Sequence, residues 1–270
     1  MKVSVLAENT ALCSEFGAEH GLSLYIETKG KKILFDMGQT ALFVCNAKKL
    51  GIDLSEADIA VLSHGHYDHG GGLGAFFEQN SSAKVYLSRY AFEEHYNAED
   101  KYIGLDKSFY REERFEFCEG ITQISAGITL FGGKGKEMPK TLGARGMKVL
   151  EKGRLAGDDF RHEQYLLIEE DGRRYLFSGC SHRGASEIAE YFKPDVFIGG
   201  FHYSKVNPET AEGRALLEAE ARALLKAGCR YYTCHCTGTE QFEFLKQIMG
   251  EKLYYISGGD RVDIDSVLGK

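Results

Sequence analysis

Hydrophobic positions along the chain form short apolar runs that alternate with amphipathic stretches. In the first half, this pattern predicts strands at residues 2–6, 22–27, 32–35, 58–62 and 84–88, helices at about 40–50 and 73–78, and a short helix after residue 88. In the second half, it predicts strands at 164–168, 174–178, 195–198, 231–234 and 253–256 and helices at 184–192, 208–226 and 239–249. Each half opens with strands and continues with strand–helix alternation, which predicts two sheets sandwiched between layers of helices.

The pattern weakens between about residues 97 and 152. This stretch contains aromatic-rich pieces and a glycine–lysine segment at residues 132–136. The segment lacks the GxxxxGK[ST] spacing of a phosphate loop, so a solvated hairpin or flap is favoured over a phosphate-binding role. No low-complexity linker divides the chain. We therefore expect a single domain over residues 1–270, with the stretch 97–152 as an insertion that forms part of the substrate site.

Groups that bind metals gather directly after the apolar run at residues 59–62. His64, His66, Asp68 and His69 lie within six residues and are followed by three glycines. On an extended segment the first three would project to one side, whereas His69 needs a turn, which glycine permits. Imidazole and carboxylate groups are ligands that zinc and related first-row metals favour. The sequence predicts a metal site at the end of a strand, with one ion at His64/His66 and a second at Asp68/His69.

Composition narrows the class of protein further. The net charge is −7 without a block of like charges, which argues against a nucleic-acid partner. No apolar run approaches the length of about 18 residues that a membrane span needs, and the N-terminus turns polar too soon for a signal peptide. The seven cysteines form no regular disulfide framework, so we expect reduced thiols and a cytoplasmic location. The oligomeric state is not indicated by the sequence.

The His64-x-His66-x-Asp68-His69 motif closely resembles the signature of the metallo-β-lactamase fold superfamily. This resemblance implies a four-layer αββα sandwich of the α/β class over nearly the whole chain. Three later segments, at residues 176–184, 199–202 and 234–238, resemble the subfamily labelled dihydropterin-ribofuranosylaminobenzene phosphate synthase-like. Superfamily members act on many substrates, so the label names a family and does not assign a substrate.

The resemblance also implies ligands later in the chain. Cys180 stands where the superfamily usually places a bridging aspartate, and it is either a thiolate ligand or an inert buried thiol. His182 follows two residues later and can face the same site, and His235 matches the last histidine of the superfamily. His162 lies close to the expected middle histidine without matching its place, so its role stays open.

Several other residues are expected around the metals. Asp36, in a turn that resembles the superfamily's Asp-x-Gly turn, is expected to orient a histidine ligand. His202 contacts substrate or is a structural histidine, while His20 and His95 are expected at the surface or outside the ligand set. Candidate cationic contacts to a phosphorylated substrate are Arg183, Lys205 and Arg145.

These residues favour a metal-dependent hydrolase that uses a metal-bound hydroxide, with Asp68 in a catalytic role. The expected cofactors are two divalent ions, zinc first and manganese or iron as alternatives. The expected partner is a small molecule, a phosphoester or a related compound. The alternatives are a mononuclear iron dioxygenase or other redox protein of the same fold, and a pterin-precursor synthase. The intact motif argues against a noncatalytic binding module.

Overall fold

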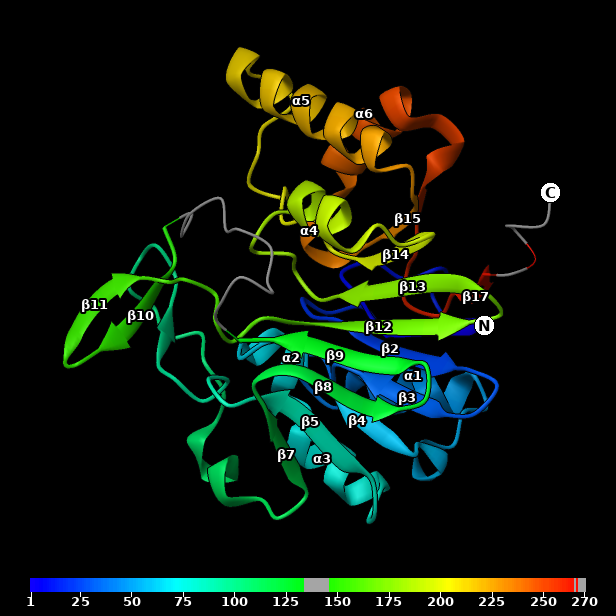
Figure 1. Ribbon diagram of the computed structural model, residues 1–270, viewed down its shortest axis with the longest axis vertical. Coiled ribbons are helices and arrows are strands. Elements are labelled where there is room, and N and C mark those ends of the chain that lie inside the picture. The colour runs from blue at the N-terminus through cyan, green and yellow to red at the C-terminus, as the bar shows by residue number, and fades with distance from the viewer. Residues whose placement is uncertain (134–145, 265, 267–270) are drawn as a thin grey trace.

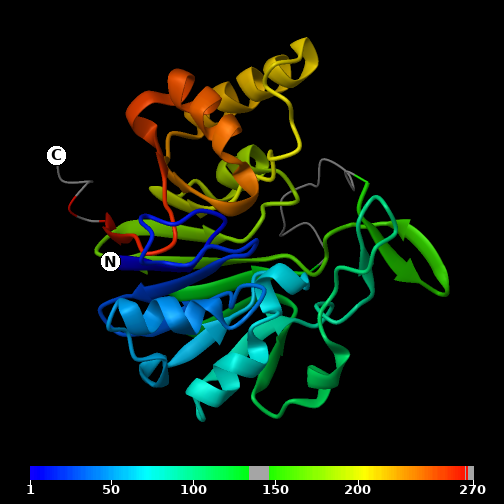
Figure 2. The same cartoon turned by 180° about the vertical axis from the view of Figure 1, so that it is seen from behind.

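Two seven-stranded sheets face each other, and each carries helices on its outer side (Figure 1). The structure, a computed structural model, describes residues 1–133, 146–264 and 266. Helices α4, α5 and α6 cover one sheet, while α1 and α3 cover the other, and the view from behind shows the same layers (Figure 2). The predicted αββα arrangement is confirmed.

The first sheet has the strand order β17-β1-β2-β3-β4-β5-β7. Its strands are β1 (Lys2–Ala7), β2 (Ser23–Glu27), β3 (Lys32–Phe35), β4 (Ile59–Val61), β5 (Lys84–Ser88), β7 (Phe115–Cys118) and β17 (Arg261–Asp263). The run from β3 to β7 is parallel, and the other pairs are antiparallel. Its helices are α1 (Leu42–Lys49), α2 (Tyr67–Gly70) and α3 (Leu73–Gln79), with 3₁₀ turns at Leu54–Glu56 and Lys107–Arg111.

The second sheet has the order β16-β15-β14-β13-β12-β9-β8. Its strands are β8 (Gly120–Ser125), β9 (Ile128–Gly132), β12 (Gln164–Glu170), β13 (Arg173–Ser178), β14 (Val196–Gly199), β15 (Arg230–Thr233) and β16 (Leu253–Tyr255). The run from β13 to β16 is parallel. Its helices are α4 (Ala185–Phe192), α5 (Ala211–Ala227) and α6 (Thr239–Met249), with 3₁₀ turns at His235–Thr237 and Gly250–Lys252.

A small third sheet stands beside the sandwich. It consists of β6 (His95–Tyr96), β10 (Lys148–Glu151) and β11 (Arg154–Gly157), and the β10–β11 hairpin projects from one side in Figure 1. Of its strands, β10 lies within the stretch of weak sequence pattern at residues 97–152, and β6 and β11 lie at the two ends of that stretch. The short helix expected after Ser88 is wrong, because hydrogen-bonded turns follow instead, from Ala91 N–H to the Ser88 carbonyl and from Glu93 N–H to the Tyr90 carbonyl.

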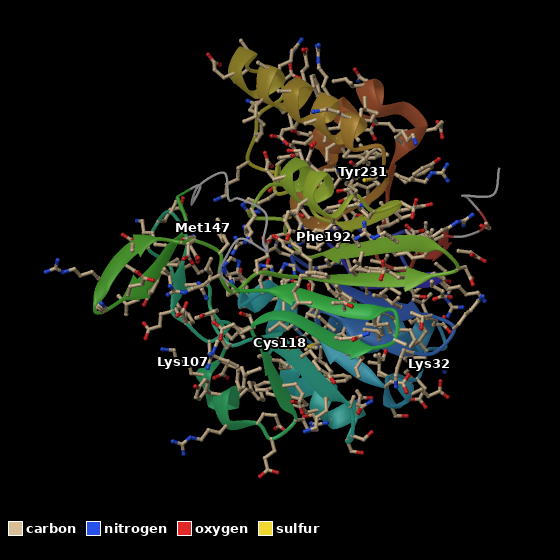
Figure 3. The ribbon with its side chains drawn as sticks, viewed as in Figure 1. Lys32, Lys107, Cys118, Met147, Phe192 and Tyr231 are labelled. Atoms are coloured by element: carbon tan, nitrogen blue, oxygen red, sulfur yellow. The ribbon has the colours of Figure 1, made fainter. Side chains whose placement is uncertain are left out.

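Alternating side chains divide the core into three layers. In β3, Ile33 and Phe35 point between the two sheets, while Leu34 points toward the helices. Phe35 meets Phe177 of the opposite sheet with 5.9 Å between ring centroids. Tyr231, with Phe192 and other residues, forms the layer between the second sheet and its helices (Figure 3). Among the described residues, every helix is too short or too polar to cross a membrane.

Local signals delimit the longest helix, α5. The Thr210 hydroxyl accepts the Gly213 N–H at 3.0 Å, which satisfies one of the free donors at the helix start. Gly228 ends the helix with a φ of +83°, a left-handed conformation that glycine adopts without strain. These signals are the reason that the sequence located this helix to within a few residues.

The inter-sheet layer is expected to dominate stability. We expect Leu166→Ala, at a fully buried position between the sheets, to lower the free energy of unfolding by about 2–5 kcal/mol, because it leaves a cavity. Leu216→Ala on α5 is the matched control, since this side chain is 45% exposed, and it should change stability by about 0.5 kcal/mol or less. Denaturant titration measures both, and equal losses would contradict this assignment of the core.

Candidate metal centre

The expected site residues lie where parallel strands of the two sheets end. β3 and β4 of the first sheet and β13, β14 and β15 of the second are each followed directly by such residues. They are Asp36 after β3; His64, His66, Asp68 and His69 after β4; Cys180 and His182 after β13; His202 after β14; and His235 after β15. The carboxyl ends of parallel strands are common ligand-binding positions in α/β sheets.

The segment after β4 turns sharply enough to direct its side chains to one place. His66 is still extended, and the short helix α2 then carries Asp68 and His69, both buried. This helix is the turn that His69 was expected to need. A Cβ on Gly65 would lie 2.1 Å from the carbonyl oxygen of Ala91, so only glycine fits at this close approach.

Three imidazoles form a first donor group: His64, His66 and His182. One nitrogen of each lies within 4.8 Å of the others, and Nε2 of His64 is 3.2 Å from Nε2 of His182. Burial, reinforced by neighbouring histidines, lowers the pKa of all three well below the usual value. The rings are therefore neutral, which is the form that binds metal ions.

A second donor group, Asp68, His69, Cys180 and His235, adjoins the first. Sγ of Cys180 lies 3.2 Å from Nε2 of His69, and Oδ2 of Asp68 lies 3.3 Å from Nε2 of His235. Burial alone would raise the pKa of the Asp68 carboxyl, but the surrounding imidazoles, His69 first, hold it well below the usual range. Burial raises the pKa of the Cys180 thiol, so a thiolate there needs a cation beside it.

Asp36 is fully buried at the end of β3 and holds two histidines in place. Its Oδ2 lies 2.6 Å from Nδ1 of His69 and accepts the Ser63 hydroxyl at 2.7 Å. Oγ of Ser63 in turn lies 2.9 Å from Nδ1 of His64. Since each Nδ1 faces an acceptor, each carries the proton. When each ring is neutral, Nε2 of His64 and of His69 keeps a lone pair for a ligand.

Asn9 orients His235 in the same way. Its Oδ1 lies 2.7 Å from Nδ1 of His235, while its Nδ2 lies 3.3 Å from Nδ1 of His20. His20 is exposed, and its Nε2 lies 3.2 Å from Oδ2 of Asp68. Sequence reasoning missed Asn9, because no local motif marks a residue that acts on a side chain 226 positions away.

The donor sets of the two groups fit divalent ions. Within each group, one donor atom of every residue lies within 4.8 Å of the others, and the residues of both groups are buried. A set of imidazole, carboxylate and thiol groups suits zinc and neighbouring first-row metals. Both donor groups therefore fit a divalent ion.

Backbone strain gathers at the same place. Asp36, Ser181, His202 and His235 have φ values of 60°, 54°, 58° and 52°. This left-handed region is unfavourable for residues other than glycine, by about 1–3 kcal/mol in strained cases, and it persists only where the surroundings enforce it. Four such residues around one centre are typical of a functional site.

The residues expected to contact substrate have different surroundings. The His202 ring lies 4.4 Å from that of His182, and His202 lines a cavity of about 400 Å³ together with Lys205. Arg183 is buried, and its Nη2 donates to the carbonyl oxygen of Phe160 at 3.0 Å. This guanidinium is thus directed into the protein, and a role in substrate binding stays a prediction.

The other basic candidates are placed as follows. His95 is fully buried, which excludes the first of its two expected positions, the surface. The second position, outside the ligand set, stays a prediction. His162, whose role was open, accepts the Gly65 N–H through Nδ1 at 2.9 Å. Arg145 lies outside the described residues, as does most of the glycine–lysine segment.

The chain belongs to the metallo-β-lactamase superfamily, whose family model matches residues 16–211. The uncharacterized protein MJ0448 of Methanocaldococcus jannaschii is 31% identical over 209 residues, which cover 74% of this chain and 78% of that protein. The 7,8-dihydropterin-6-methyl-4-(β-D-ribofuranosyl)-aminobenzene-5′-phosphate synthase of the same organism is 29% identical over 264 residues, 88% of each chain. The resemblance seen in the sequence is confirmed.

A solved structure supports the same conclusion. The crystal structure of Tm1679, described as a metal-dependent hydrolase of the β-lactamase superfamily, superposes with a TM-score of 0.80. It shares 29% sequence identity and covers 98% of this chain and 99% of its own. Similarity in fold and in sequence therefore extends over nearly the whole chain.

The network around Asp36 gives a direct prediction. We expect Asp36→Asn to weaken the binding of divalent ions about 10–100-fold, because an amide is a poorer acceptor for the N–H of His69. Competition with a chromogenic chelator measures the affinity. Asp171→Asn, at a side chain 58% exposed, is the matched control and should leave affinity unchanged. Unaltered affinity in a folded Asp36→Asn chain would show that Asp36 does not orient the ligands.

Proposed function

We propose that this chain is a dinuclear metal-dependent hydrolase that acts on a phosphoester or a related small molecule. The observation that carries the proposal is the placement of two donor groups next to each other. The ring of His69, in the second group, lies 4.1 Å from that of His64, in the first. Asp36 directs lone pairs from both groups toward the centre.

The chemistry divides between the ions and the chain. Divalent ions at these groups supply a Lewis acid for the substrate and lower the pKa of a water molecule toward neutrality. Asp68 has the catalytic role, because its carboxylate stays ionised and its Oδ2 faces His235 and His20. With ions bound, this carboxylate would accept a hydrogen bond from the attacking water and orient it. Cys180 favours zinc over harder ions as the occupant of the second group.

The cavity lined by His202 and Lys205 suits a phosphorylated substrate. Lys205 is exposed in the cavity that His202 lines, and an ammonium group is a suitable point contact for a phosphate. His202 connects this cavity to the metal groups through its contact with His182. The name of the synthase relative includes a 5′-phosphate, which agrees with this class of ligand.

A second candidate function is a synthase of a pterin precursor. It rests on the relative with that activity in its name, which is 29% identical over 88% of each chain. The two candidates are separated by their products. A hydrolase releases phosphate or an alcohol from a single substrate with water, whereas a synthase joins two substrates.

The proposal predicts metal-dependent turnover of phosphate esters. Chains reconstituted with zinc, manganese or iron should bind about two ions each and hydrolyse chromogenic phosphodiesters or phosphomonoesters. Lactones and thioesters in the same panel test the related acyl substrates. His66→Ala should abolish turnover and reduce the metal content while the chain remains folded, because it removes a member of the first donor group.

Cys229→Ala serves as the control. Cys229 is buried, directly precedes β15 at the end of the strand away from His235, and belongs to neither group. It should retain both ions and full activity. Turnover that survives His66→Ala, or a wild-type chain that binds no metal after reconstitution, would refute the dinuclear mechanism.

A further inference from the structure

A second buried polar cluster lies against His66, and the proposed hydrolysis does not use it. It consists of His95 on β6 together with Asp158 and His162 from the connection between β11 and β12, here called the Asp158 cluster. Each of the three is at most 3% exposed. One donor atom of each, and one of His66, lie within 4.8 Å of one another.

A single carboxylate anchors this cluster. Oδ1 of Asp158 accepts the Phe160 N–H at 2.8 Å, and Oδ2 lies 2.8 Å from Nδ1 of His95 and 3.4 Å from Nε2 of His162. The two imidazole rings stack with 3.8 Å between their centroids. A buried carboxylate needs such donors, because an unpaired charge is costly in the interior.

The hydrogen bonds assign the protons. The Gly65 N–H donates to Nδ1 of His162 at 2.9 Å, so the proton of this neutral ring is on Nε2, toward Asp158. Nδ1 of His95 faces the same carboxylate and carries its proton, which leaves a lone pair on Nε2 of His95. Since His162 has no lone pair to offer from Nε2, the cluster is poorly suited to hold a cation of its own.

His66 can supply the donor that the lone pair on Nε2 of His95 lacks. Its Nε2 is sealed from solvent without a hydrogen bond, and so is Nε2 of His95. The His66 ring meets that of His95 edge-on at 5.6 Å and lies 5.1 Å from that of His162. A histidine that binds an ion through one nitrogen carries a proton on the other and normally donates it to a neighbouring acceptor.

We propose that the Asp158 cluster positions His66 for binding of the first ion, an inference that rests on the proposed metal centre. Asp158 holds both rings, His162 holds the backbone of the loop at Gly65, and His95 accepts the outer N–H of His66. These are positioning residues, since none of them belongs to either of the two donor groups proposed to hold the ions.

Backbone contacts extend this support to the small sheet. The Ile103 N–H donates to the carbonyl of His95 at 2.8 Å, and the Tyr67 N–H donates to the carbonyl of Ile103 at 2.9 Å. A bridge also joins His66 and Gly104. The segment around β6 therefore contacts the metal-binding loop through both main chain and side chain.

Two substitutions at His95 test the proposal. His95→Gln keeps a carbonyl that can accept a hydrogen bond, whereas His95→Phe keeps a ring without an acceptor. We expect His95→Phe to weaken one of the two zinc sites about 10–100-fold and to lower kcat with little change in KM, and His95→Gln to recover part of both. Chelator competition measures the affinities, and Co(II) absorption spectra report the altered ligand field. Asp158→Asn should weaken the same zinc site and lower kcat as His95→Phe does.

Each contrary result has its own meaning. Equal affinities and equal kcat in wild type, His95→Phe and His95→Gln, all folded by circular dichroism, would overturn the positioning role. A third zinc ion in wild type that is lost in Asp158→Asn would overturn it in favour of a cation site. A wild-type chain that binds no zinc would remove the metal centre itself, and with it this inference, so the two failures are distinguishable.

Discussion

The buried carboxylate of Asp36 is the interaction on which the centre depends. It receives the Ser63 N–H and hydroxyl, both at 2.7 Å, and contacts Nδ1 of His69 at 2.6 Å. These donors compensate for burying the charge, and they orient His69 directly and His64 through Ser63. The backbone of Asp36 is strained, with a φ of 60°, and this conformation places the carboxylate. The chain therefore leaves regular strand geometry directly after β3 in favour of the site.

The second constraint is the close approach of the two sheets at their strand ends. A Cβ on Gly179 would lie 2.2 Å from Oγ of Ser63, so a glycine after β13 lets the second sheet reach the first. Cys180, His182 and His235 come from that sheet, and without this approach each donor group would be incomplete. The site is therefore a property of the packed sandwich and not of the motif after β4 alone.

Local patterns predicted most of the fold and indicated most of the candidate metal-binding residues, because apolar periodicity and the clustered histidines are local in sequence. The residues that support them were not predictable in this way. Asn9 reaches His235 across the whole chain, and β17 pairs with β1 at the opposite end of it. Asp158 lacks a motif of its own, since its partner His95 lies 63 positions away. Such contacts follow only from the folded arrangement.

The proposed dinuclear centre requires two ions in adjacent sites, one in each donor group. X-ray diffraction from crystals of the zinc-loaded chain, recorded on both sides of the zinc absorption edge, locates bound zinc directly. We expect two anomalous peaks, one among His64, His66 and His182 and the other among Asp68, His69, Cys180 and His235. A single peak, or peaks away from these side chains in a fully loaded crystal, would contradict it.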